Sequence, residues 1–385
     1  MKNKTTEKNA GLRLLLTMSI VTLAGHTGFA MDHFGGNDQD QEDSQYQQIN
    51  LVSDISAVAQ LQDTNLVNAW GTGFGATGPF WIANNGSGKA TLYAVTNDAT
   101  GAPHVTRNAR VVTIPGNGSV TGMLNNSTPG FNGDAFIFVS EDGTISGWRG
   151  ALGNNAEILN TRNTAVYKGV TLVTNGVPLL LAANFGEGTI DEYDSTAHLI
   201  RQFADRQAPA GYAPFNVQNV SGIVFVTFSK QDAAKHDDDP GRGRGLIDVL
   251  DPTTGTFHRF ATGRAAGGNI REMNSPWGVT VSPRTFGSHG GQLLIGNKGS
   301  GTIMTFDTFG KFHGLLTGTG ECPVTIDTLW ALTFGATGTA GVSTDLYFTA
   351  GPNNENHGLF GAIQPLKDND GDNDDSGSQN GDRHH

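Results

Sequence analysis

The chain of 385 residues has one cysteine, Cys322, so an internal disulfide is excluded. No histidine stands near Cys322-Pro323 in the sequence, which favours an inert thiol over a nucleophile. A Gly-x-Ser-x-Gly nucleophile motif is also missing from the sequence. Stability must therefore come from a hydrophobic core, and the chain is long enough to bury one.

Long apolar runs are absent after the first 30 residues. Those residues begin with Lys2, Lys4 and Lys8, continue with an apolar stretch from Leu14 to Ala24, and end in Gly28-Phe29-Ala30. This is the pattern of a secretory signal peptide, and its apolar part is too short to cross a hydrocarbon layer of ~30 Å. We expect cleavage near Ala30, export to the periplasm or the extracellular space, and no membrane insertion after cleavage.

Positive charge is scarce: 24 Lys and Arg stand against 36 Asp and Glu, for a net charge of −12. The signal segment holds four Lys or Arg and one Glu, so its removal takes away +3 and leaves −15. Such a chain, with no basic stripe, repels nucleic acid. Residues 31–48 and 367–385 are acidic and lack apolar periodicity, and we predict a disordered linker and a disordered tail there.

Helical periodicity is lacking as well, whereas glycine is abundant at 54 residues, which indicates many short strands joined by tight turns. One stretch, Asn184–Asp194, recurs as Asn297–Asp307 and, shortened, as Glu141–Trp148. Each copy follows an apolar run, turns through glycines and then alternates apolar and polar residues, as a β-hairpin does. The fold class is all-β.

Six such units follow one another, and their equivalent positions are spaced by 51, 47, 47, 62 and 53 residues. These positions are Trp70, Thr121, Lys168, Phe215, Trp277 and Trp330. A period of about 40 to 50 residues with four strands per unit is typical of a β-propeller. We therefore predict a six-bladed β-propeller over residues 49–366, closed by pairing the strand Ile49–Ile55 with Gly358–Ile363. We interpret the recurring tryptophans as core packing between blades rather than a stacking platform for ligands.

One rim of the propeller gathers polar side chains, because the connection into each innermost strand and the turn after each second strand lie on the same face. Oxygen-bearing side chains there could hold Ca²⁺ or orient a polar ligand. The predicted metal ligands are Asp327, Asn184 and Asn297. The alternative for Asn84, Asn184 and Asn297 is plain turn chemistry, since Asn before x-Gly suits a tight turn.

The fourth unit departs from the repeat on the same rim, with a long loop over residues 229–245. Long loops on rigid scaffolds often carry function. The imidazole and carboxylates of residues 236–239 offer metal ligands or an acid and base pair, and the alternative is a solvated charged loop. The predicted ligand-binding residues on this rim are His236, Asp237, Asp238, Lys230, Asn68, Asn274 and Glu141.

Several long motifs carry a family resemblance: Asn-Leu-Val-Asn-Ala-Trp-Gly (65–71), residues 141–148, 210–219 and 230–238, and Asn-Ser-Pro-Trp-Gly (274–278). With these motifs the chain resembles a family of uncharacterised exported bacterial proteins, from about Asn50 to Gln364. The family is similar in pattern to six-bladed propellers of the NHL and gluconolactonase-like groups. The resemblance implies a propeller fold and export. Gluconolactonase-like metal sites usually include a glutamate early in the first blade, where this chain offers only Asp54 and Asp63.

Two functional hypotheses follow. The first is a monomeric, exported, non-enzymatic propeller that binds a polar small molecule or a protein through the rim bearing the 229–245 loop. The second is a calcium-dependent hydrolase or lactonase with Asp327, Asn68, Asn184 and His236 around a central ion.

Overall fold

The computed structural model describes residues 44–174 and 176–366. The predicted signal peptide, most of the predicted linker and the acidic tail lie outside the described residues. Strand β1 (Tyr46–Ser53) begins inside the stretch 31–48, so the last residues assigned to the linker belong to a sheet. The strand also ends before Ile55, because residues 54–60 turn back toward β2 (Leu61–Gln62).

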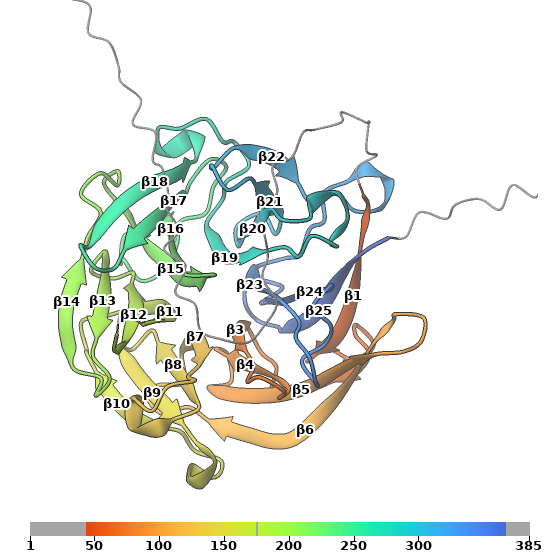
Figure 1. The fold of residues 1–385 in the computed structure, drawn as a ribbon, viewed down its shortest axis with the longest axis horizontal. Helices are drawn as coiled ribbons and strands as arrows, with labels where there is room; N and C mark the ends of the chain where they lie inside the picture. Colours follow the sequence, from red (N-terminus) through yellow and green to blue (C-terminus); the bar gives the residue numbers. More distant parts are fainter. Residues whose placement is uncertain (1–43, 175, 367–385) are drawn as a thin grey trace, which may run out of the picture. The chain divides into compact units, whose positions relative to one another are not determined.

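Six sheets, antiparallel apart from the pair β1–β2, surround a common centre and form the blades of a β-propeller, as the repeat predicts (Figure 1). Blade 1 consists of β3 (Ala69–Gly73), β4 (Phe80–Asn84), β5 (Lys89–Asn97) and β6 (Pro103–Thr113). Blade 2 consists of β7 (Val120–Asn125), β8 (Phe136–Ser140), β9 (Thr144–Trp148) and β10 (Glu157–Thr161). Blade 3 consists of β11 (Tyr167–Thr174), β12 (Pro178–Asn184), β13 (Thr189–Tyr193) and β14 (Leu199–Phe203).

Blade 4 consists of β15 (Tyr212–Val220), β16 (Ile223–Lys230), β17 (Leu246–Asp251) and β18 (Thr256–Thr262). Blade 5 consists of β19 (Pro276–Val281), β20 (Leu293–Asn297), β21 (Ile303–Phe306) and β22 (Phe312–Leu315). Blade 6 consists of β23 (Leu329–Phe334), β24 (Leu346–Ala350), β25 (Leu359–Pro365), β1 and β2. The helices in the described ranges are short 3₁₀ turns at Phe131–Gly133, Gly150–Leu152, Arg264–Ala266, Gly287–His289 and Thr319–Glu321.

The N-terminal strand closes the ring, as predicted. β1 pairs antiparallel with β25, with Ile49 opposite Ala362 and Ser53 opposite Leu359. Leu51 and Val52 on β1 are fully buried. β2 adds a fifth strand, parallel to β1, that the repeat does not predict. Because β1 pairs with β25, the last blade is completed by the start of the propeller, and the outer edge of β25 is covered.

The second strand of most blades is buried on both faces. β4, β8, β12, β20 and β24 contain buried residues throughout or nearly so, whereas the outer strands β10 and β14 are mostly exposed. A strand covered on both faces reads as a continuous apolar run rather than an alternation, which explains the stretch Leu179–Ala183. Each fully buried Leu, Ile or Val contributes about 1.5–3 kcal/mol, so the blades form a firm scaffold for the loops.

Every innermost strand carries a β-bulge at the same place. The pairing register shifts at the bulge in β3, β7, β11, β15, β19 and β23. The residues in these bulges are the six repeat positions, Trp70, Thr121, Lys168, Phe215, Trp277 and Trp330. A bulge re-aims a side chain. The side chains at the repeat positions thus depart from the regular alternation between the two faces of the strand.

Glycine after the bulge lets neighbouring inner strands approach closely. A Cβ on Gly71 would lie 2.6 Å from the Thr121 carbonyl oxygen, and a Cβ on Gly122 would lie 2.8 Å from Gly169 Cα. Such contacts involve backbone and cannot be relieved by a side-chain rotation. The inner strands therefore pack around the centre at a spacing that only glycine permits here.

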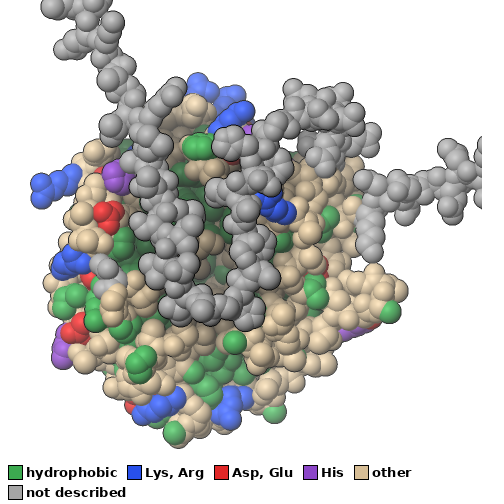
Figure 2. All heavy atoms as spheres, in the orientation of Figure 1, with side chains coloured by type: hydrophobic (Ala, Val, Ile, Leu, Met, Phe, Trp, Pro, Cys, Tyr) green, Lys and Arg blue, Asp and Glu red, His purple; other side chains and the backbone are tan. Residues whose placement is uncertain are grey.

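No helix within the described ranges has the length and hydropathy needed to span a bilayer. Figure 2 shows Lys and Arg side chains as separate spots, mostly around the periphery of the face in view.

Candidate functional site

An aromatic cluster fills the centre of the ring. Trp70 and Trp330 stack with ring centroids 3.6 Å apart, and Trp277 meets both edge-on at 6.5 and 6.0 Å. Phe215 packs on Trp330 and Phe185 on Phe215. These five side chains, called the aromatic floor below, are all buried. The tryptophans are therefore packing residues, as interpreted from the sequence, and they join blades that are far apart in the chain.

A series of linked polar side chains, closed through the peptide bond between Asp237 and Asp238, lies against this floor, and we call it the mouth ring. Its members are Asn68, Asn85, Glu141, Lys168, Asp237, Asp238, Lys298 and Glu355. They come from all six blades: the approach to β3, the turns after β4, β8 and β20, strand β11, and the loops after β16 and β24. Their common origin on the loops that enter the inner and third strands places them on the rim predicted to carry the site.

Lys168 is the most deeply buried cation of the mouth ring, with its side chain 1% exposed. Its Nζ contacts Glu141 Oε1 and lies 3.0 Å from Asp237 Oδ1 and 5.3 Å from the centre of the Trp70 ring. Burial alone would lower the pKa of Lys168, but the carboxylates of Glu141 and Asp237 outweigh it and raise the pKa. Lys168 is therefore a fixed positive charge that needs both carboxylates.

Lys298, which follows β20 in blade 5, forms the second cationic centre of the ring. Its Nζ lies 3.0 Å from Asp238 Oδ1, 3.0 Å from Glu355 Oε1 and 5.4 Å from the centre of the Trp330 ring. Burial alone would lower the pKa of Lys298, but the carboxylates of Asp238 and Glu355 outweigh this effect and raise the pKa. Each lysine thus covers one tryptophan of the stacked pair and binds two carboxylates.

Amide side chains link the two cationic centres. Asn85 Nδ2 donates to Glu141 Oε2 (3.1 Å), and Asn68 Nδ2 donates to Glu355 Oε2 (2.9 Å) and to Asn85 Oδ1 (3.3 Å). Asn68 also accepts a hydrogen bond from Trp330 Nε1 (2.9 Å), which ties the ring to the floor. The backbone of Asn68 is left-handed, with φ +47°, a conformation that Asn adopts more readily than most residues.

Two buried polar atoms beside the mouth ring have no hydrogen-bond partner in the described part of the chain. They are Asp238 Oδ2, whose side chain is 3% exposed, and Trp70 Nε1. A buried donor and a buried acceptor left unpaired are costly. Asp238 Oδ2 can accept a hydrogen bond from a small polar species, and Trp70 Nε1 can donate one.

The loop after β16 folds as a small hairpin over the ring. Gln231 and Asp238 form an isolated antiparallel bridge, and Asp232 Oδ1 accepts hydrogen bonds from the backbone of His236 (2.9 Å) and Asp237 (3.3 Å). Gln231 Nε2 donates to the carbonyl oxygen of Phe185 in blade 3 (2.5 Å). The loop is therefore an ordered element that spans two blades.

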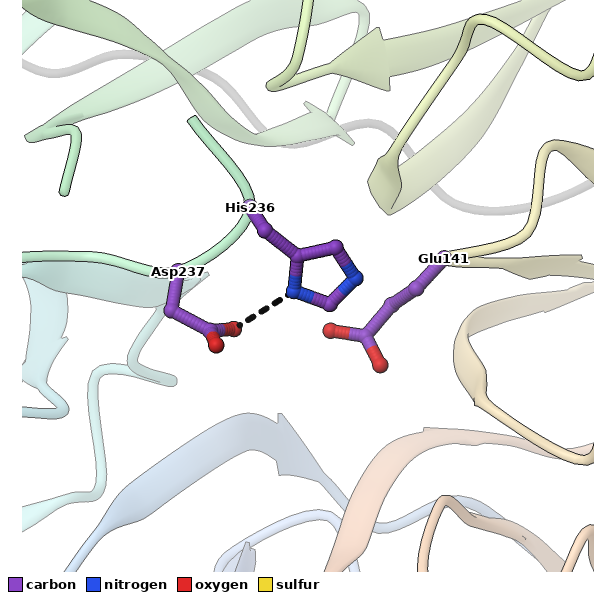
Figure 3. A group of neighbouring side chains, drawn as sticks. All are labelled: Glu141, His236 and Asp237. Atoms are coloured by element: carbon purple, nitrogen blue, oxygen red, sulfur yellow. Dashed lines mark ion pairs between the residues drawn. The ribbon is translucent and has the colours of Figure 1, made fainter. Parts of the chain in front are cut away.

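His236, Asp237 and Glu141 point toward one another at the edge of the ring (Figure 3). His236 Nδ1 lies 3.2 Å from Asp237 Oδ1. One ligand atom from each of the three residues can be chosen so that all lie within 4.8 Å of one another. Among the His, Cys, Asp and Glu residues described, this is the only group of three with that proximity.

Five of the seven predicted ligand-binding residues meet here: Asn68, Glu141, His236, Asp237 and Asp238. The other two, Lys230 and Asn274, anchor the loop. Lys230 Nζ pairs with Asp239 Oδ2 (3.1 Å), and Asn274 Oδ1 accepts a hydrogen bond from the Gly241 amide (2.6 Å).

The predicted metal ligands are engaged elsewhere. Asn184 bonds within its own turn and to Asp191, and Asn297 bonds to the backbone of Asn274 and Glu272 and to Thr302. Asp327 accepts hydrogen bonds from Thr328 Oγ1 (3.2 Å) and the Asn353 amide (2.8 Å).

No hydrogen bond or ion pair among the described residues joins Asp327, Asn184 or Asn297 to one another or to His236. For Asn184 and Asn297 the structure favours the turn chemistry left open by the sequence. The two acids near the start of blade 1 are also structural: Asp54 pairs with His357, and Asp63 binds Tyr93 and Arg107.

Sequence reasoning missed four members of the mouth ring, Asn85, Lys168, Lys298 and Glu355. Two signals were present. Lys168 is the one charged residue among the six repeat positions, and Asn85, Glu141 and Lys298 each follow the last residue of a second strand. Glu355 lies in residues 351–358, a second long connection, between β24 and β25, which the repeat does not predict.

The central channel beyond the aromatic floor is almost filled. A cavity of about 40 Å³ remains, lined by Thr72, Met123, Val170, Gln218 and other inner-strand residues. That volume has room for little more than water. A larger hollow of about 280 Å³ lies between blades 3 and 4 at the other ends of the strands, and no charged residue lines it. Neither of these two cavities is lined by a charged residue.

Comparison with known proteins adds relatives without a known activity. No family model matches the chain. It is 26% identical over 339 residues to the uncharacterized protein L690 of Acanthamoeba polyphaga mimivirus, covering 81% of this chain and 84% of that one. It is 28% identical over 338 residues to protein R648 of the same virus, covering 81% and 78%. These relatives are viral, so the bacterial and exported parts of the resemblance stay predictions.

Solved structures share the fold at low identity. An alpha-L-arabinanase from Penicillium chrysogenum aligns with a TM-score of 0.50 and 11% identity, over 83% of this chain and 98% of that one. Virginiamycin B lyase from Staphylococcus aureus aligns with a TM-score of 0.48 and 13% identity, over 84% and 99%. At such identity the likeness concerns the fold alone.

Proposed function

We propose that this protein is a ligand-binding β-propeller that takes a small cationic ligand at the mouth ring. The observation that carries the proposal is the charge of the ring. Four carboxylates, on Glu141, Asp237, Asp238 and Glu355, face two ammonium groups, on Lys168 and Lys298, so the ring has a net charge of −2. A negative mouth in a chain of net charge −12 attracts cations and repels anions.

The arrangement supports a small ligand rather than a long one. Glu141, Asp238 and both lysines are sunk within the ring, whereas Asp237 is 66% exposed and His236 is 47% exposed. A ligand that enters from solvent therefore passes Asp237 and His236 before it reaches the buried carboxylates and lysines. The unpaired Asp238 Oδ2 supports a ligand or a bound water that donates a hydrogen bond at this depth.

Ligand binding at the mouth ring can be followed by the fluorescence of the tryptophans in the aromatic floor. Of five tryptophans in the chain, Trp70, Trp277 and Trp330 belong to the floor, and two of them lie under the ring lysines. Titration with the cations spermidine and agmatine should change the tryptophan fluorescence saturably, whereas the anions citrate and glucuronate should not. Saturable binding of citrate or glucuronate in place of the two cations would refute the proposal.

Matched variants localise the binding. The double variant Glu141→Gln with Asp237→Asn should weaken cation binding at least tenfold, because the ring then loses its excess negative charge. Asp307→Asn is the control, since this acid pairs with His313 on an outer turn. Deletion of residues 231–243 should abolish binding while leaving the circular dichroism of the blades unchanged. Undiminished binding in the double variant would place the cation elsewhere and overturn the assignment.

We also propose, from the sequence alone, that the chain is exported and loses residues 1–30. Mass spectrometry of the protein recovered from outside the cytoplasm should give a chain that begins at Met31. Recovery only of full-length chain from the cytoplasm would refute export.

A further inference from the structure

We propose that Glu141, His236 and Asp237 form a binding site for a divalent first-row transition-metal ion such as Zn²⁺. The inference rests on the proposed function, because it names one cationic ligand of the mouth ring. Two separate segments build the site: Glu141 lies in the turn after β8, and His236 and Asp237 lie in the loop after β16. Their side chains converge in Figure 3.

The donor set selects the class of metal. It supplies one imidazole nitrogen and two carboxylates, a combination that suits Zn²⁺ and its neighbours. Ca²⁺ prefers six to eight oxygen ligands and Mg²⁺ an octahedron of oxygens, and three residues of which one is histidine match neither. Three protein ligands leave at least one coordination position to water.

The geometry needs only a small adjustment. Ligand atoms about 2.1 Å from a tetrahedral Zn²⁺ are separated by roughly 3.4 Å, and the three groups already lie within 4.8 Å of one another. His236 and Asp237 are the two most exposed members of the site, so their side chains can move by about this difference. Within the described residues, Asp237 Oδ2 and His236 Nε2 have no hydrogen bond or ion pair to give up.

Lys168 is the competing cation. Its ammonium group binds Glu141 and lies 3.0 Å from Asp237 Oδ1, so it already neutralises both carboxylates that the metal needs. A metal ion bound to the other faces of these carboxylates is repelled by Lys168 at short range. The structure therefore predicts a moderate affinity that is limited by Lys168.

The test uses the full chain, freed of metal with a chelator and titrated with ZnCl₂ or CaCl₂ by isothermal titration calorimetry. We expect one Zn²⁺ to bind per chain with moderate affinity, and Ca²⁺ to bind at least 100-fold more weakly. His236→Ala and Glu141→Gln should each weaken Zn²⁺ binding at least 30-fold. Lys168→Met should tighten it about tenfold, which a merely structural lysine would not do.

Two controls separate this site from other histidines. His104→Ala removes an exposed histidine whose ring lies 2.9 Å from Asp98 without a third ligand. The double variant His384→Ala with His385→Ala removes the histidine pair at the end of the sequence. Both should leave the Zn²⁺ affinity unchanged.

Three outcomes would overturn the inference: no Zn²⁺ binding, Zn²⁺ binding that His236→Ala leaves intact, or Lys168→Met binding no tighter than the wild type. If Zn²⁺ fails to bind while spermidine still changes the tryptophan fluorescence, the metal site is wrong and the cationic mouth stands. If neither binds, both proposals fall.

Discussion

Replacing Lys168 by methionine isolates the energetic role of the mouth ring. Methionine keeps the packing against Trp70 and Phe185 and removes the charge. Glu141, which is 10% exposed, then loses its cation but keeps the hydrogen bond from Asn85. Removing one partner of a buried ion pair costs about 3–5 kcal/mol. Asp237 is largely exposed and adds little to this cost. We therefore expect a loss of about 3 kcal/mol in the free energy of unfolding.

Urea unfolding followed by tryptophan fluorescence and by circular dichroism measures this loss. The double variant Lys168→Met with Glu141→Gln should have a free energy of unfolding only about 1 kcal/mol below that of the wild type, because no buried charge remains unpaired. Lys230→Met is the matched control: its ion pair with Asp239 lies on the same face but is exposed, so it should cost under about 1 kcal/mol. If Lys168→Met costs no more than Lys230→Met, the ring lysine does not stabilise the mouth as argued.

Three further predictions concern the scaffold. Leu51→Ala, in the fully buried part of β1, should cost about 2–5 kcal/mol and lower the Tm, because it weakens ring closure. Burial raises the pKa of Asp248 to about 7 despite its contact with Arg259, so the folded state keeps a proton that the unfolded chain loses near pH 4. Wild type should therefore lose up to about 3 kcal/mol relative to Asp248→Asn between pH 5 and pH 8. Gly122→Ala should cost about 1–3 kcal/mol, because its Cβ meets Gly169 Cα at 2.8 Å.

Each of these has a control on the same element or in similar surroundings. Gln48→Ala lies on the exposed part of β1 and should change the unfolding free energy by less than about 0.5 kcal/mol. Asp251→Asn, at the half-buried end of the strand that carries Asp248, should leave the loss between pH 5 and pH 8 in place. Gly150→Ala adds a Cβ with no atom within 4 Å and should be tolerated. Equal effects in control and test variants would contradict the reasoning in each case.

The fold could be predicted from the sequence because a blade is a local structure. Strand, glycine turn and strand lie within about 15 residues in stretches such as Leu179–Tyr193, and the period-two pattern and the turn residues identify each hairpin on its own. Repetition of the hairpin then fixes the number of blades. The closing strand was predictable because Ile49–Ser53 has strand character and no hairpin partner beside it. Its limits were wrong by two or three residues, since pairing with β25 decides where β1 begins and ends.

The site was only partly predictable. The long loop after β16 and the rim on which it lies were identified, since both follow from the lengths of connections along the chain. For Lys298 the signal was only its place directly after a second strand, and for Glu355 only the length of the connection between β24 and β25. An isolated charge in a turn is most simply interpreted as solvated surface. The three predicted metal ligands were not brought together, because each is used by a nearby backbone amide. Asn184 accepts from Glu187, Asn297 from Asn274 and Asp327 from Asn353.

By itself the sequence determined an all-β chain of six hairpin repeats with an acidic balance and one unusual loop. Only the tertiary structure decided that Lys168 meets Asp237, 69 residues later, and that Asn68 meets Glu355, 287 residues later. The physical reason is that periodicity encodes which face of a strand is buried, whereas an ion pair depends on distances between side chains that closure of the ring sets. The bulge at each inner strand turns one residue per blade toward the centre, and what those residues and their neighbours bind follows from that convergence.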